Sequence, residues 1–168
     1  MGKTLLAQRM LERYGYPYFS IDHLKMGLIR SGYTDLTPED DDALTEYLWP
    51  IVREMVRTAI ENGQNLIVEG CYIPPDWRKD FSEEYLWSIE FVCLAMSDAY
   101  IDAHIGEIRE YARAIEARLD DSGCTLSELK EGNHRCIDAF TECDEKVTIV
   151  ESDFEATIEA VLEQFNPV

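Results

Sequence analysis

The sequence predicts an α/β fold with a mainly parallel sheet, because short apolar segments alternate along the chain with longer helical patterns. Each segment has the length of a strand and contains a short apolar run, which is typical of strands covered by helices on both faces. A chain of 168 residues, 46% of them hydrophobic, is long enough to bury a sizeable core. We therefore expect residues 1–168 to form a single domain.

The opening residues Gly2, Lys3 and Thr4 stand directly before a helical pattern, in which positions 5, 6, 10 and 11 form an apolar stripe. Gly-Lys-Thr ends the phosphate-binding motif G-x-x-x-x-G-K-[ST], whose lysine reaches the outer phosphates and whose hydroxyl binds magnesium. The position of Gly-Lys-Thr at a helix N-terminus favours phosphate binding. A solvated lysine and a helix-capping threonine are the alternative. The strand that normally precedes the motif is absent from the sequence.

Four segments are predicted to be strands. The first follows a Gly-Tyr-Pro turn, the second is stopped by Pro74 and Pro75, and the third is centred on residues 91–94. Their predicted ranges are 16–21, 65–73, 88–96 and 146–150.

Capping residues mark the helices between these strands. Thr37 and Pro38 predict the start of a long helix with an apolar face over 44–60, and Pro50 is expected to kink it. Thr125 and Ser152 each begin a predicted capping box, the second one opening a terminal helix. The acidic run 39–42 looks like a metal cluster, but its place in a first helical turn is better explained by the helix dipole.

The overall charge excludes several classes of partner. The formal net charge is -19, so the general surface should bind neither nucleic acid nor an anionic membrane. Five cysteines without C-x-x-C spacing indicate reduced thiols in a cytoplasm, and no apolar run is long enough for a membrane span. We expect a soluble cytoplasmic protein in which any anionic ligand meets a local basic pocket.

Three motifs together resemble the P-loop small-molecule and nucleoside-monophosphate kinases. They are Gly2-Lys3-Thr4 before a helix, residues 19–22 ending a strand with Asp22, and residues 66–70 ending a strand with Glu69 and Gly70. The chain is most similar to bacterial proteins labelled adenylate kinase or 2-phosphoglycerate kinase, above all over residues 20–30. The resemblance covers nearly the whole chain and implies a three-layer P-loop kinase-like fold. In that fold the missing first strand would be central, between the predicted strands 65–73 and 88–96.

The resemblance also implies ATP and Mg²⁺ as cofactors. Gly2, Lys3 and Thr4 would hold the phosphates, and Thr4 would contact the metal. Asp22 would accept or orient the proton of an acceptor hydroxyl, although an aspartate here could also cap the following helix.

Glu69 is expensive to bury unless it is paired or near a cation. It is expected to serve the magnesium shell or the acceptor, and the alternative is a carboxylate that reaches solvent at the strand tip.

Several cations could complete such a site. Lys25 and Arg30 could bind an anionic acceptor or lie on a solvated helix face. The rigid loop 72–78 carries Arg78, which suits an acceptor site, and Trp77, which is expected to serve packing. A lid-like helical segment at about 97–123 would supply arginines that stabilise the transferred phosphoryl group. These are Arg109, Arg113 and Arg118, with Arg113 and Arg118 preferred; Glu110 and Glu116 could instead neutralise Arg113.

These residues predict an ATP-dependent phosphotransferase that acts on a small-molecule or nucleotide acceptor. The rival hypothesis is a non-catalytic kinase-like remnant or interaction protein, because the phosphate loop is incomplete. The loops do not identify the acceptor, and the sequence leaves the oligomeric state open.

Overall fold

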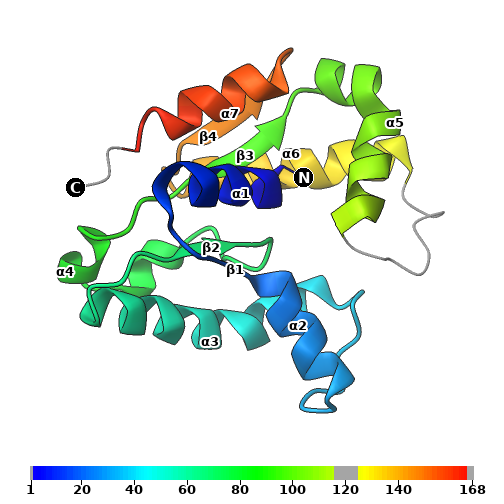
Figure 1. Ribbon diagram of the computed structural model, residues 1–168. Helices are drawn as coiled ribbons and strands as arrows, with labels where there is room; N and C mark the ends of the chain where they lie inside the picture. Colours follow the sequence, from blue (N-terminus) through cyan, green and yellow to red (C-terminus); the bar gives the residue numbers. More distant parts are fainter. Residues whose placement is uncertain (1, 116–124, 166–168) are drawn as a thin grey trace. The chain divides into compact units, whose positions relative to one another are not determined.

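The computed structural model describes residues 2–115 and 125–165. The chain divides into two compact units, residues 2–90 and the part that begins at Phe91. The helices and strands of the two units are labelled in Figure 1.

The first unit is built on two parallel strands, β1 (Tyr18–Ser20) and β2 (Ile67–Glu69). Tyr18 pairs with Ile67 and Ser20 pairs with Glu69, so both strands end at the same edge. In Figure 1 the strand pair lies between two helices, α1 and α3. The helical segments of this unit are α1 (Lys3–Tyr14), α2 (Ile21–Arg30), α3 (Asp41–Glu61), the 3₁₀ turn η1 (Trp77–Asp80) and α4 (Glu83–Leu86).

Glycines set both ends of α1. Gly2 precedes the helix with φ 90°, and Gly15 follows it with φ 72° and donates its N–H to the Leu11 carbonyl. Both positions are left-handed, a conformation that glycine adopts without a steric penalty. The helix buries Leu6, Ala7 and Met10, which confirms the amphipathic pattern that follows the Gly-Lys-Thr triplet.

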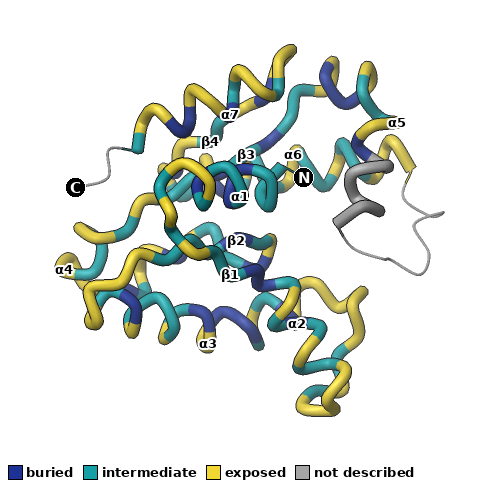
Figure 2. Tube along the Cα trace, in the orientation of Figure 1, coloured by how far each residue is buried: buried dark blue, intermediate teal, exposed yellow. Residues whose placement is uncertain are grey.

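Helix α3 begins later than the sequence predicts. Thr37 donates its N–H and its hydroxyl to the Asp40 carboxylate, each over 2.8 Å, but this box closes a turn ahead of the helix. The N-cap residue is Asp40, and Asp41 and Asp42 occupy the first turn. Helix α3 continues through Pro50 to Glu61. Its buried face, visible as the dark stretches in Figure 2, consists of Leu44, Leu48, Trp49, Val52 and Ala59.

An aromatic cluster fixes η1 against α3. Trp77 is 2% exposed and meets Phe81 edge to face, with the ring centroids 5.9 Å apart. Trp49 donates its indole N–H to Asp80 over 2.7 Å, and Arg57 donates to the Asp80 carbonyl. The expectation that Trp77 serves packing is confirmed.

The second unit has its own parallel pair, β3 (Cys93–Met96) and β4 (Val147–Val150). The Asn133 side chain binds the backbone of β3, because it accepts the Met96 N–H and donates to the Met96 carbonyl. Tyr100, Ile101, Ile108 and Val150 form a core cluster. The helices are α5 (Asp98–Ile115), α6 (Leu126–Glu142) and α7 (Phe154–Leu162).

One of the two capping boxes predicted in this unit forms as predicted, and the other begins one residue later. Thr125 and Glu128 form the complete box at α6, as predicted. At α7 the N-cap is Asp153, which accepts the Ala156 N–H over 2.9 Å, so the cap lies one residue later than predicted at Ser152.

The α/β class and the parallel pairing are confirmed, but the described strands form two separate two-stranded sheets. Each strand is shorter than its predicted apolar segment; the first one stops at Ser20 because Ile21 already belongs to α2. Within the described residues, no helix has the length and apolar character needed to span a membrane.

Gly70 allows β2 and α2 to approach closely. A Cβ at this position would lie 2.7 Å from the Ile21 Cβ, closer than carbon atoms can pack. Gly70→Ala should therefore lower the free energy of unfolding by about 1–3 kcal/mol through overpacking, as measured by urea unfolding. Gly27→Ala, in α2 with open space around it, is the matched control and should stabilise the protein by about 0.5–1 kcal/mol. Equal effects of the two changes would contradict the close approach.

The Glu128 carboxylate has a pKa below its usual range, because the Thr125 backbone N–H and hydroxyl both donate to it. A lowered folded-state pKa stabilises the protein above the unfolded value of about 4.3 and loses this contribution as the pH falls through the folded value. Glu128→Gln should therefore lower the urea midpoint at pH 7, and the difference should vanish in acid. Glu131→Gln, an exposed change on the same helix, is the matched control for the loss of a carboxylate.

Candidate functional site

The candidate site lies at the shared carboxyl edge of β1 and β2. Glu69 ends β2, Asp22 stands in the first turn of α2 directly after β1, and the Ser20–Glu69 register brings these strand ends together. Thr4, at the start of α1, reaches the same edge by donating its hydroxyl to Glu69 Oε2 over 3.2 Å. The structure thus joins the predicted phosphate-loop residues to one of the two predicted strand-end carboxylates.

Glu69 is buried, with 6% of its surface exposed. The alternative of a carboxylate that reaches solvent at the strand tip is therefore wrong. One oxygen accepts the Thr4 hydroxyl, whereas the buried Oε1 has no hydrogen-bond partner among the described residues. A buried polar atom without a partner is costly and is uncommon in native structures.

Lys3 lies half-buried beside this carboxylate. Burial works to lower its pKa, but the neighbouring Cys71, which hydrogen-bonds the ammonium, and the charge of Glu69 outweigh this effect and raise the pKa above its ordinary value. Lys3 therefore carries a full positive charge at neutral pH. Lys3 is therefore not a freely solvated lysine, which was the alternative to a phosphate-binding role.

Asp22 is held by a second lysine. Lys25 Nζ lies 2.9 Å from Asp22 Oδ1 and donates to the Tyr72 hydroxyl over 3.0 Å. Tyr72 in turn donates its O–H to Asp41 Oδ1 over 3.2 Å. Lys25 is 5% exposed, so the alternative of a solvated helix face is wrong for this residue. The alternative that Asp22 caps α2 is also wrong, since Ser20 is the N-cap residue.

The protonation states of this network follow from its contacts. Burial works to lower the pKa of Lys25, but the hydrogen bonds to Tyr72 and Asp22 outweigh it and the pKa is raised. Burial raises the pKa of the Tyr72 phenol; Lys25 opposes this rise, and Asp41 and Asp22 add to it. At neutral pH the network therefore holds an ammonium and a neutral phenol.

The predicted acceptor-binding arginines of this unit lie on its surface. Arg30 is exposed in the last turn of α2, at the end of the helix opposite to Asp22. Arg78 is exposed in η1, where its guanidinium stacks on the Trp77 ring at 4.5 Å. The substrate roles expected of Arg30 and Arg78 stay predictions.

The predicted lid arginines belong to the second unit. Residues 98–115 form α5, whose backbone departs from helical geometry at His104. Arg109 and Arg113 lie on this helix, and Arg118 lies outside the described residues. Their proposed role at the phosphoryl group stays a prediction.

Tyr72 and Asp41 lie in this network but are not among the residues predicted for the site, and Lys25, for which a solvated helix face was one alternative, is buried. The spacing of Asp22 and Lys25, three residues apart on one helix, is a signal for a salt bridge. Tyr72 follows the Glu69-Gly70 strand end by two residues, so it could have been placed at the same edge. The contact of Asp41 with Tyr72 joins positions 31 residues apart and has no local signal.

The residues of this edge fit a magnesium ion shared with a nucleotide. No three His, Cys, Asp or Glu side chains gather into a metal-binding group within residues 2–115 and 125–165. Mg²⁺ bound with nucleotide phosphates takes only one or two protein ligands and keeps several waters. The Thr4 hydroxyl and the partnerless Glu69 oxygen supply ligands of this kind.

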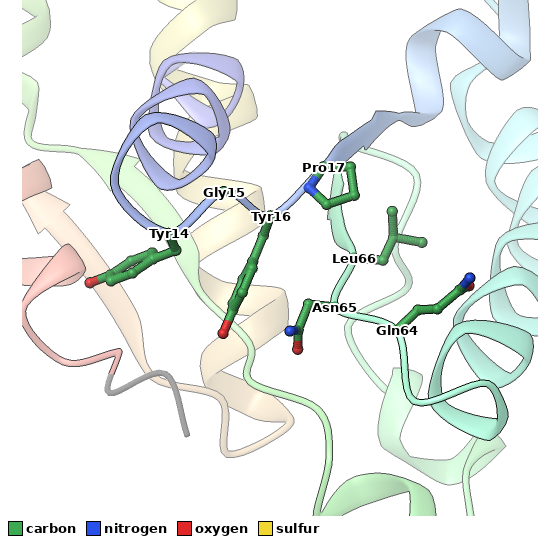
Figure 3. Close-up of a pocket in the computed structure, with 7 residues that line it drawn as sticks. All are labelled: Tyr14, Gly15, Tyr16, Pro17, Gln64, Asn65 and Leu66. Carbon is green, nitrogen blue, oxygen red and sulfur yellow. The ribbon is translucent and has the colours of Figure 1, made fainter.

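An open pocket of about 490 Å³ lies at the other end of the strands (Figure 3). Residues 14–17, before β1, and residues 64–66, before β2, line it. The described lining carries phenol and amide groups and neither a carboxylate nor a basic side chain. It contains none of the predicted site residues, so the charged chemistry is concentrated at the carboxyl edge.

Comparison with known proteins adds no assignment to this geometry. The chain matches no family model and no curated protein sequence.

The partnerless oxygen of Glu69 predicts that this residue costs stability. Glu69→Met removes the buried carboxylate and should raise the free energy of unfolding of the ligand-free protein by about 1–3 kcal/mol, as measured by urea unfolding. Glu90→Met, at an exposed position of the same unit, should change it by less than about 0.5 kcal/mol. A clear loss of stability in Glu69→Met would show that the carboxylate is structural.

Proposed function

We propose that this chain is an ATP-dependent phosphotransferase that acts with Mg²⁺ on a small-molecule or nucleotide acceptor. The observation that carries the proposal is the contact between Thr4 and Glu69, which joins a Gly-Lys-Thr helix start to a buried carboxylate with one oxygen still available. Phosphate-binding helices and strand-end carboxylates meet in this way where open α/β sheets bind nucleotides.

The proposed roles follow from the charges at this edge. The N–H groups at the start of α1 and the Lys3 ammonium offer positive charge to the outer phosphates of ATP. Thr4 and Glu69 would hold the magnesium ion, which neutralises charge on the phosphate oxygens when bound. Asp22 would hold the acceptor hydroxyl by accepting its hydrogen bond.

In the proposed reaction, the acceptor oxygen forms a bond to the terminal phosphorus of ATP as the bond from that phosphorus to the bridging oxygen of ADP breaks. The acceptor proton passes to Asp22 and then to solvent. Catalysis in this scheme rests on positioning and on charge stabilisation, because the transferred group is already activated. Arg113 and Arg118 are proposed to contribute to that stabilisation, and Arg30, Glu69 and Arg78 to acceptor binding.

A three-layer P-loop kinase-like fold goes with this function. The support for it is the parallel pairing in both units and the placement of helices on either side of the β1–β2 pair.

Calorimetry with MgATP tests the proposal directly. We expect Lys3→Ala to weaken MgATP binding by about 10-fold to 100-fold, the range for a lost charge-assisted hydrogen bond to phosphate. Lys79→Ala is the matched control, because Lys79 is an exposed lysine paired with Asp76 in the same unit; it should bind as the wild type does. No binding to the wild type at millimolar MgATP would contradict the phosphotransferase and favour the kinase-like remnant. Equal affinity of Lys3→Ala and wild type would make the opening triplet incidental.

A further inference from the structure

A chain of polar contacts ties Asp22 to two other elements of the first unit. Asp41 at the start of α3 accepts from Tyr72, Tyr72 accepts from Lys25, and Lys25 is paired with Asp22. The three contacts measure 3.2, 3.0 and 2.9 Å. The orientation of Asp22 is therefore fixed from the loop after β2 and from α3, as well as from its own helix.

The burial of Lys25 is not a consequence of its spacing from Asp22. Lys79 and Asp76 have the same spacing of three residues, yet their side chains are 62% and 48% exposed. The Lys25 side chain is 6% exposed, and its ammonium also lies 5.0 Å from the centre of the Tyr72 ring. An exposed ion pair such as Lys79–Asp76 contributes little to the stability of a protein. Lys25, in contrast, is enclosed by partners from separate elements.

Stability alone is a weak reason for this arrangement. Desolvating a charged pair costs about as much as its attraction returns, so buried ion pairs are often no better than apolar residues of the same size. What such a pair supplies is a fixed geometry. The preorganisation of charged groups is what phosphoryl transfer requires from a protein.

The geometry leaves Asp22 usable by a ligand. Lys25 occupies Oδ1, the Asp22 side chain is 22% exposed, and no hydrogen bond to Oδ2 comes from the described residues. Lys25 itself is poorly placed to bind an anionic acceptor, because it is buried and its charge is already paired. Its effect on a reaction must therefore pass through Asp22.

We propose that Lys25 and Tyr72 are positioning residues that hold the Asp22 carboxylate in place for the acceptor hydroxyl. This inference rests on the proposed phosphotransferase function. Lys25 fixes one carboxylate oxygen and leaves the other for the acceptor, and Tyr72 with Asp41 keeps the Lys25 ammonium from turning away.

The experiment measures MgATP hydrolysis with water as the acceptor, and MgATP affinity by calorimetry, on the full chain. Lys25→Met should lower kcat by about 10-fold to 100-fold, the size expected for a misplaced reacting group, without changing the dissociation constant for MgATP. Tyr72→Phe, which keeps the ring and removes only the hydroxyl link, should cause a smaller loss in the same direction. Lys79→Met, the exposed lysine of equal spacing, should turn over as the wild type does.

Epistasis with Asp22 separates positioning from a structural role. If Lys25 acts through Asp22, the double variant Lys25→Met/Asp22→Asn should be no slower than Asp22→Asn alone. Independent losses that multiply in the double variant would overturn the inference. Wild-type turnover in Lys25→Met and Tyr72→Phe would also overturn it.

Failure of the underlying function gives a different pattern. In that case the wild type itself neither binds nor hydrolyses MgATP, whatever the state of Lys25. Should Lys25→Met fail to fold, Tyr72→Phe alone decides the inference, and a wild-type kcat in that variant overturns it.

Discussion

The parallel pairing of β1 with β2, in the register that sets Ser20 beside Glu69, decides where the candidate side chains of the first unit lie. A shift by one residue would turn Glu69 to the opposite face of the pair. The pairing also brings the start of α2 against Gly70, where a Cβ would come within 2.7 Å of Ile21. The absence of a side chain at one position thus allows α2, and with it Asp22, to begin directly beside the end of β2.

Buried polar groups are unevenly distributed in the described residues. The buried polar residues are Ser20, Lys25, Glu69 and Glu145. The first three lie on β1, α2 and β2, around one edge of the strand pair. Charges are expensive to bury. The ion pair with Asp22 and the hydrogen bond to Tyr72 offset this cost for Lys25. The cost is offset only in part for Glu69, because one of its oxygens has no hydrogen-bond partner among the described residues. This edge therefore holds a paired buried charge, on Lys25, and a buried carboxylate oxygen without a hydrogen-bond partner among the described residues.

The sequence predicts the local features of this chain better than its long-range contacts. The helix after Gly2, the box at Thr125, and the carboxylates directly after β1 and at the end of β2 follow from patterns a few residues long. The strand lengths were overestimated, since an apolar run continues into turns and helix starts that only the packing defines, as Ile21 shows. The network from Asp41 to Lys25 was missed because it joins three separate elements. The separation of the strands into two pairs likewise depends on which strands meet, which composition and periodicity do not report.

In the proposed function, a nucleotide binds at the carboxyl edge of β1 and β2. Two-dimensional ¹H–¹⁵N NMR of the labelled full chain, titrated with MgADP, tests it most directly. The proposal predicts that the largest amide shifts fall on Lys3, Thr4 and residues 69–72. Shifts centred instead on the pocket of residues 14–17 and 64–66, or no saturable shifts at millimolar MgADP, would contradict it.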